Sequence, residues 1–154
     1  MKIISHRGNL YGPSPETEND QYQIYKALEL GFDVEVDLWL KGGKYYIGHD
    51  SPDNLVSIDF IKAISPYAWF HCKNLDALYD MSTNFPKFNY FWHESDKFTL
   101  TSKGFIWTYP GQEITDNSII VLKGDEGIED IPGKPYGICT DYAVRMHLTK
   151  RNCF

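Results

Sequence analysis

Two carboxylates lie two residues apart in a segment that is otherwise apolar. Glu35 and Asp37 alternate with Val34 and Val36, and alternate residues of a strand point to the same face. Two like charges held this close repel each other and raise one pKa unless a cation lies between them. Carboxylate oxygens are the ligands that Mg²⁺ and Ca²⁺ prefer. The pattern therefore predicts a divalent-cation site, with an amphipathic strand whose acidic face meets solvent as the alternative.

Two histidines flank this segment and could transfer protons. His6 and His49 titrate near neutrality, so one can act as general base and the other as general acid. Arg7 and Lys73 are suited to phosphoryl oxygens, the arginine as a two-pronged donor and the lysine as a point charge. Each of the four alone is more often a structural or surface residue. Their combination with two carboxylates indicates phosphate chemistry.

The elements that must position these residues are short strands alternating with helices. The predicted strands are Lys2–Ser5, Asp33–Leu38, Lys44–Ile47, Tyr67–Cys72, Phe88–Trp92, Phe105–Thr108, Ser118–Leu122 and Tyr136–Thr140. Helices are predicted at Glu18–Leu30, Ser57–Ile64 and Asn74–Met81, and a hairpin turn at Gly42-Gly43. Because polar residues follow the strands, a parallel sheet would gather them at the edge where α/β proteins build their sites.

Four ordered motifs together resemble a known enzyme family. They are His6-Arg7-Gly8, Glu18-Asn19, the run from Ala27 to Asp37, and His49-Asp50. In order and spacing they resemble the amino-terminal half of the glycerophosphodiester phosphodiesterase family, within the phosphatidylinositol-phosphodiesterase-like TIM-barrel superfamily. Beyond Asp50 the similarity is confined to Phe70-His71-Cys72-Lys73 and Ile138-Cys139-Thr140-Asp141, which resemble a later strand and the closing strand of the family.

This resemblance implies a role for each matched residue. The acid–base pair would be His6 and His49, the metal ligands would include Glu35 and Asp37, and the phosphoryl oxygens would be bound by Arg7 and Lys73. Glu18-Asn19 would support the first loop. In this family a hydroxyl of the substrate itself often attacks the phosphorus, which gives a cyclic phosphate.

One departure from the family pattern concerns the metal. The third family ligand is an acidic residue two positions before the lysine, and here that position holds His71. Imidazole suits Zn²⁺, Mn²⁺ or Fe²⁺ better than Mg²⁺ or Ca²⁺. Either His71 binds a softer metal, or Glu94 supplies the missing carboxylate, or the metal is held more weakly. We expect one divalent cation, Mg²⁺ or Ca²⁺, with Mn²⁺ or Zn²⁺ if His71 is a ligand.

The length of the chain constrains the fold that the resemblance implies. A (β/α)₈ barrel typically needs about 250 residues, and this chain has 154. Lys44–Ile47 is set aside as a hairpin arm, and the stretches after Trp92 are too short for full helices. We therefore expect one domain over residues 1–154, with the α/β fold of a reduced TIM-type (β/α) barrel. It would have trimmed outer helices and seven or eight mostly parallel strands, closed or partly open.

The composition excludes several classes of protein. Hydrophobic residues make up 42% of the chain and aromatic residues 16%, which excludes intrinsic disorder. A net charge of −6 without any Lys/Arg block argues against nucleic-acid binding. No apolar run approaches the roughly 18 residues of a membrane-spanning helix, and no signal-peptide core is evident, so we expect a cytoplasmic protein. The three cysteines are too widely spaced to suggest a disulfide framework or a zinc finger.

The function that these residues indicate is metal-dependent cleavage of a small glycerophosphodiester-like substrate by His/His general acid–base catalysis. The alternative is a non-catalytic module that binds a phosphoester or a glycan on the same scaffold. Aromatic and hydroxyl residues between Phe91 and Pro110 could form the wall of such a pocket or an ordinary core. A third interpretation is a structural α/β domain whose polar loops are merely solvated.

Overall fold

A mixed β-sheet organises the computed structural model, which describes residues 1–152. Its strands are β1 (Lys2–His6), β2 (Asp33–Lys41), β3 (Lys44–Ile47), β4 (Asn54–Val56), β5 (Ala68–Cys72), β6 (Tyr90–Phe91), β7 (Phe98–Leu100), β8 (Ile106–Thr108), β9 (Ser118–Val121) and β10 (Gly137–Thr140). Eight strands form the path β4-β3-β2-β1-β10-β9-β8-β7, and β5 and β6 branch from β2. The first strand, β1, therefore pairs with the last strand, β10, in the middle of this path.

The sheet combines parallel and antiparallel pairs. Parallel ladders join the strands in the order β6-β5-β2-β1-β10-β9-β8. Antiparallel ladders join β3 to β2 and β4, and β7 to β8. Within residues 1–152 no ladder closes the sheet between β6 and β8. The sheet is thus an open, curled half-barrel.

The predicted TIM-type barrel is therefore wrong. A TIM barrel is a closed ring of parallel strands with a helix after each one, whereas this sheet is mixed and open. Its helices are α1 (Gln21–Glu29), α2 (Ile58–Ile64), α3 (Leu75–Asn84) and α4 (Ala143–Asn152). In the described part of the chain, β8 is followed by a loop and β9 by a short 3₁₀ turn, η1 (Ile128–Asp130). In the described residues after α3, α4 is the only α-helix that covers the sheet, and β7 pairs antiparallel with β8.

Helix starts and the first hairpin follow from local residue chemistry. Asp20, Ser57 and Asn74 have extended backbones, and their side chains accept hydrogen bonds from the first turns of α1, α2 and α3. The starts predicted for α2 and α3 are confirmed. Gly42 and Gly43, with φ of +58° and +73°, form the predicted hairpin turn between β2 and β3.

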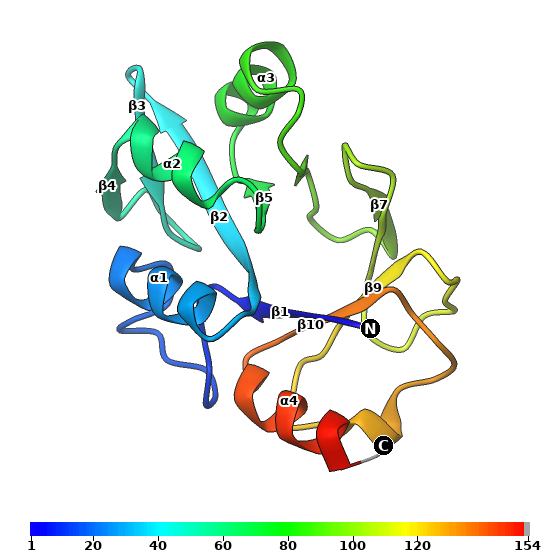
Figure 1. Cartoon of the computed structure of the whole chain (residues 1–154). Helices are drawn as coiled ribbons and strands as arrows, with labels where there is room; N and C mark the ends of the chain where they lie inside the picture. Colours follow the sequence, from blue (N-terminus) through cyan, green and yellow to red (C-terminus); the bar gives the residue numbers. More distant parts are fainter. Residues whose placement is uncertain (153–154) are drawn as a thin grey trace.

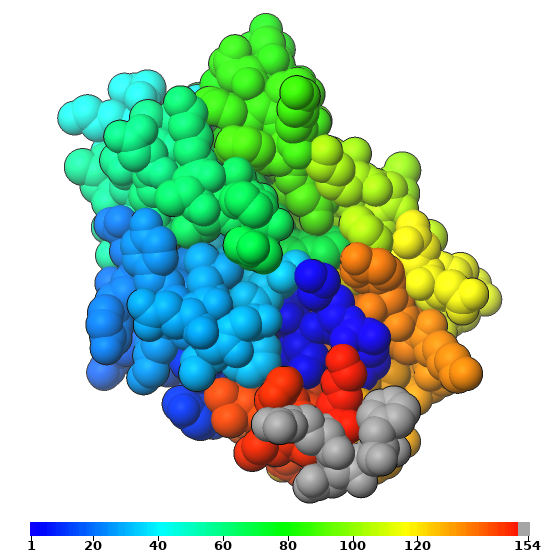
Figure 2. Space-filling model, viewed as in Figure 1, coloured from blue at the N-terminus to red at the C-terminus, as the bar shows by residue number. Residues whose placement is uncertain are grey.

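Helices cover only part of the sheet. Figure 1 shows α1, α2 and α3 around the β2–β5 side and α4 below β1 and β10, while loops border β7 and β9. In the same view, Figure 2 shows the dark-blue start of the chain reaching the surface between light-blue and orange-red segments. No helix in the described residues has the length and apolarity needed to cross a membrane.

Two apolar clusters fill the two faces of the curled sheet. The larger cluster packs the outer face of β2 and β5, including Val34, Val36 and Phe70, against the helices. The smaller cluster consists of Ile4, Trp69, Phe91, Trp107, Ile119 and Cys139. In the ladders, Ile4 lies opposite Asp33, and Trp69 lies opposite Glu35. The smaller cluster therefore shares a face of the sheet with the acidic residues of β2.

Candidate active site

Glu35, Asp37 and His71 lie together on the face of the sheet that carries the smaller cluster. Asp37 is the ladder partner of His71, and Glu35 comes two residues earlier on β2. The side chains of the two carboxylates are 2% and 1% exposed, so the solvent-facing alternative is wrong. Val34 and Val36, on the opposite face, are fully buried. Strand geometry thus brings two acids and an imidazole together beneath the carboxyl edge of the sheet.

The three side chains present donor atoms of a kind that bind metals. One ligand atom from each lies within 4.8 Å of the other two. Nδ1 of His71 is 3.1 Å from Oδ1 of Asp37 and 3.5 Å from Oε1 of Glu35. Its Nε2 is 2.9 Å from the carbonyl oxygen of His93, to which it donates. This second hydrogen bond directs Nδ1 at the carboxylates, as is usual for metal-binding histidines. Glu94 is exposed and lies outside this group.

One carboxylate oxygen of Asp37 is fixed by Asn19, and the other has no well-directed hydrogen bond. The side-chain amide of Asn19 donates to Oδ2 of Asp37 over 2.8 Å and accepts from the Asp37 amide over 3.1 Å. Oδ1 is buried and has no well-directed hydrogen bond, although Nζ of Lys73 lies 3.7 Å away. Ion pairs with His71 at 3.1 Å and Lys73 at 3.7 Å, without a directed hydrogen bond, leave part of the cost of burying this oxygen uncompensated. A cation beside Oδ1 would remove that cost.

The surrounding charges determine the ionisation of this cluster. Burial alone would raise the pKa of Asp37, but the contact with His71 and the positive charges of His71, Arg7 and Lys73 hold it well below its usual range. Burial alone would lower the pKa of His71, but hydrogen bonding to Asp37 and Glu35 raises it to about 9. Without a metal, a protonated His71 thus carries the positive charge between the two carboxylates.

Arg7 and Lys73, the predicted phosphate ligands, both reach the cluster. Nη1 of Arg7 is 3.1 Å from Glu18, and its Nε is 3.2 Å from Oδ2 of Asp37. Arg7 has a positive φ of +55°, and its backbone amide donates to Glu35. Such a conformation is strained for a residue with a side chain and is typical of functional sites. The loop after β1 is thus tied directly to β2.

His6 is oriented by a residue that the sequence interpretation did not assign. Its Nδ1 is 2.9 Å from Oδ1 of Asp141, and its Nε2 is 3.9 Å from Oε2 of Glu35. The amide of Asn9 also donates to Asp141, over 2.8 Å. Burial lowers the pKa of His6, but the Asp141 hydrogen bond and the Glu35 charge outweigh it and raise the pKa. In the sequence, Asp141 stands directly after a predicted strand and ends a motif that resembles the closing strand of the family, but neither signal gave it a role.

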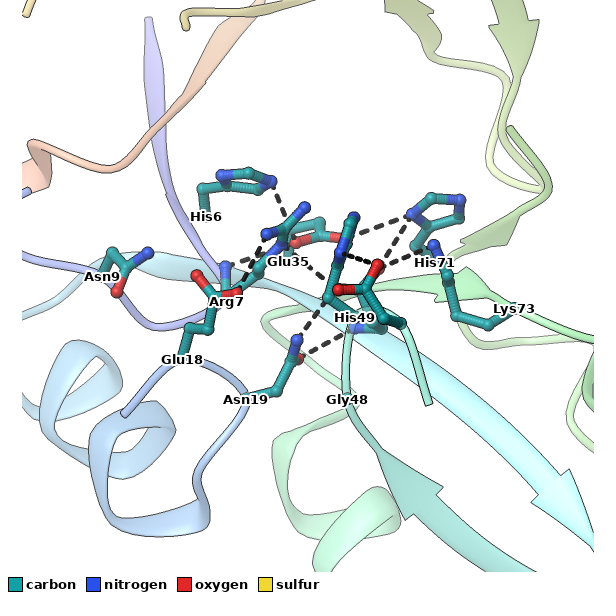
Figure 3. Close-up of polar contacts among 12 residues, drawn as sticks. His6, Arg7, Asn9, Glu18, Asn19, Glu35, Gly48, His49, His71 and Lys73 are labelled. Carbon is teal, nitrogen blue, oxygen red and sulfur yellow. Dashed lines mark hydrogen bonds and ion pairs between the residues drawn. The ribbon is translucent and has the colours of Figure 1, made fainter. Parts of the chain in front are cut away.

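His49 lies on the opposite side of the cluster, on the loop after β3. Its Nδ1 is 2.8 Å from Oδ1 of Asp50, and its side chain is 38% exposed. The indole of Trp39 donates to the carbonyl of Gly48 over 2.7 Å, which holds the loop against β2. A side chain at Gly48 would collide with the carbonyl of Ser51, so the tight loop requires glycine. Figure 3 shows His49 in front of Glu35, with His6 and His71 on either side.

A single pocket of about 510 Å³ collects these groups. It is lined by His6, Arg7, Glu35, His49, His71, Lys73 and Asp141, together with His93, Glu94, Trp107, Tyr109, Pro110, Val121, Leu122 and Lys123. Asp37 is buried directly beneath. Six of the seven residues predicted from the sequence thus line one pocket, and the seventh, Asp37, contacts Arg7, His71 and Lys73. Asp141, Tyr109 and Lys123 are added by the fold.

No family model, curated protein or solved structure matches this chain. The resemblance to glycerophosphodiester phosphodiesterases stays a prediction from the sequence motifs.

Proposed function

We propose that this protein is a metal-dependent phosphodiesterase that cleaves a small glycerophosphodiester-like substrate. One observation carries the proposal. His6, which is hydrogen-bonded to Asp141, lines the same pocket as a set of acids and cations. These are Glu35, His71, Arg7 and Lys73. Phosphoryl transfer needs positioned charge around the phosphate oxygens and groups that move protons. A pocket of about 510 Å³ is in the range of small-molecule sites.

The donor set fits a divalent cation. Two buried carboxylates and one imidazole with a fixed second hydrogen bond are present, and Oδ1 of Asp37 has no well-directed hydrogen bond. The carboxylates alone would suit Mg²⁺ or Ca²⁺, whereas the imidazole nitrogen favours Mn²⁺ or Zn²⁺. When bound, such a cation supplies Lewis-acid polarisation of the phosphoryl group.

The protein's own groups supply charge and proton transfer. Arg7 and Lys73 place positive charge at the pocket, where the phosphate oxygens gain charge in the transition state. Asp141 accepts the Nδ1 proton of His6 and so keeps Nε2 directed at the pocket. His49, held by Asp50, faces the pocket from the other side. One histidine takes the proton of the attacking hydroxyl, and the other protonates the leaving oxygen.

The proposal excludes nucleic acid as the partner. Its support is the acidic net charge of −6 and the small number of cations that line the pocket. A small phosphodiester needs only the few cations found here, whereas a nucleic acid is bound through a broad basic surface.

The test is hydrolysis of bis(p-nitrophenyl) phosphate and of glycerophosphodiesters after chelation and addition of Mg²⁺, Ca²⁺, Mn²⁺ or Zn²⁺. We expect metal-dependent turnover that His6→Ala or His49→Ala reduces by about 10²- to 10⁴-fold. His147→Ala is the matched control, because His147 is exposed and does not line the site pocket. Folded His6→Ala and His49→Ala proteins with undiminished turnover would refute the mechanism.

A non-catalytic phosphoester-binding module is the second candidate function. His71 favours this candidate, because it replaces a carboxylate of the family pattern. When protonated, His71 also neutralises part of the negative charge of Glu35 and Asp37 without any metal. Calorimetry with glycerol 3-phosphate separates the two candidates. Affinity for this ligand without turnover of any diester under the four metals would identify a binding module.

A further inference from the structure

The site pocket extends beyond the predicted catalytic residues, along the ends of β8 and β9. Tyr109 directly follows β8, and Lys123 lies two residues after β9. Leu122 still pairs with β10, because its amide donates to the carbonyl of Cys139 over 2.9 Å. Lys123 is therefore the first residue beyond the hydrogen-bonded edge. Because no α-helix lies between β8 and β9 or between β9 and β10, this end of the pocket is lined largely by side chains of the loops after these strands.

Lys123 is held in a defined place by Tyr109. Its ammonium lies 4.3 Å from the centre of the Tyr109 ring and donates a hydrogen bond to the Tyr109 hydroxyl. An aromatic face attracts a cation through the negative potential of its ring. The contact reduces the freedom of the long lysine side chain and presents its charge to the pocket.

The charge of Lys123 is unpaired, in contrast to that of the other cations in the pocket. Arg7 lies within 3.2 Å of carboxylates on two residues, and Lys73 is 3.7 Å from Asp37. Within the described chain, no carboxylate lies within ion-pair distance of Lys123. Lys123 is thus the pocket cation whose charge a ligand can still neutralise.

The aromatic residues of this end are poorly placed to stack on a sugar. Trp107 is 4% exposed and stacks on Phe91 with ring centres 4.5 Å apart. Lys123 covers a face of Tyr109. The chemistry available here is therefore a positive charge and a phenol hydroxyl, which together suit an anion.

We propose that Lys123, positioned by Tyr109, binds a second anionic group of the substrate, a carboxylate or a phosphate on the alcohol side of the phosphodiester. This subsite rests on the proposed function, because it assumes that the reacting phosphate occupies the Arg7–Lys73 end. It defines the substrate class as phosphodiesters that carry an additional negative charge.

Calorimetry with two matched probes tests the subsite without any turnover. Glycerol 3-phosphate and 3-phosphoglycerate are similar in size, and the second has a carboxylate in place of a hydroxymethyl group. We expect the wild-type protein to bind 3-phosphoglycerate about tenfold more tightly, the typical effect of one charged hydrogen bond. Lys123→Ala should remove this preference while keeping the affinity for glycerol 3-phosphate.

Two further variants separate the subsite from general effects of charge and folding. Lys62→Ala removes an exposed lysine of α2 outside the pocket and should leave the preference unchanged. Tyr109→Phe keeps the ring but removes the hydroxyl, and should reduce the preference in part. A wild-type protein that binds the two probes equally, or binds neither, would overturn the subsite, as would a Lys123→Ala protein that keeps the preference. Failure of diester hydrolysis alone would count against the phosphodiesterase and leave this binding result standing.

Discussion

Nδ1 of His71 lies 3.1 Å from Oδ1 of Asp37, across the ladder that joins β2 and β5. Oδ1 has no well-directed hydrogen bond, and the other nitrogen of His71 is committed to the carbonyl of His93. The lone pair that could bind a metal is thus the one that a proton occupies in the metal-free protein. Proton and metal therefore compete for one position between the carboxylates.

The identity of residue 71 should determine metal preference. His71→Glu supplies a third carboxylate, so we expect a larger stabilisation by Mg²⁺ or Ca²⁺ and a smaller one by Mn²⁺ or Zn²⁺ than in the wild type. Melting temperatures with each metal, relative to chelator, measure the change. Glu94→Gln is the control and should leave the metal response unaltered. If Glu94→Gln abolishes the response and His71→Glu does not change it, Glu94 is the third ligand.

The metal-free protein should lose stability as the pH rises from 6.5 to about 9. The pKa of His71 is raised from 6.5 to about 9 in the fold, so its protonated form is favoured by folding. This contribution is fully present below pH 6.5 and is lost as the pH rises through the folded pKa. It amounts to about 3 kcal/mol at most. Urea denaturation with chelator at both ends of this range, for wild type and His71→Gln, measures it. An equal pH dependence in both proteins would contradict the assignment.

Asp141 should act on the reaction through the orientation of His6. Asp141→Asn keeps the shape but can no longer accept the Nδ1 proton with a full charge, so the wrong tautomer is favoured. We expect kcat to fall by about 10²-fold or more, with an altered pH profile and little change in KM. Asp125→Asn is the control, since Asp125 is 74% exposed and pairs with Arg145. A fall in stability with an unchanged pH profile would mean that Asp141 is only structural.

Two substitutions at Asn19 should separate backbone strain from ligand positioning. Asn19 has a φ of +54° and is hydrogen-bonded to Asp37 in both directions. Both Asn19→Ala and Asn19→Gly remove these bonds and should weaken metal binding about tenfold or more. Only Asn19→Ala also places an unfavourable residue at positive φ, so it should be less stable than Asn19→Gly by about 1 kcal/mol. Chelator-buffered metal titration and urea denaturation measure the two effects. Unchanged metal affinity in both variants would show that Asp37 needs no support.

Features that depend on neighbouring residues could be predicted from the sequence. The alternation of Glu35 and Asp37 with valines places both acids on one face, because the side-chain period of a strand is two. Ser57 and Asn74 begin helices because their side chains satisfy free amides of the first turn, and Gly42-Gly43 tolerates the positive φ of a tight hairpin. These effects are independent of the rest of the fold, so the sequence alone is sufficient for them.

The closure of the sheet was decided by tertiary structure. A reduced TIM-type barrel of mostly parallel strands, closed or partly open, was predicted from the family resemblance and from the alternation of strands and helices in the first half of the chain. In the second half, β7 instead pairs antiparallel with β8, and within the described residues no α-helix lies between β8 and β9 or between β9 and β10. Whether a sheet closes depends on contacts between distant strands and on the layer that covers them, and no local pattern encodes these.

The partners of the site residues were also decided by tertiary structure. Asp141 lies 135 residues from His6 along the chain, and the carbonyl that orients His71 belongs to His93. Lys123 reaches the pocket only because β9 pairs with β10 and β8. By itself, the sequence determined which residues can bind a cation or move a proton, since that depends on side-chain chemistry and local spacing. The fold determined which of their atoms meet, because the curl of the sheet alone brings the carboxyl ends of distant strands to one pocket.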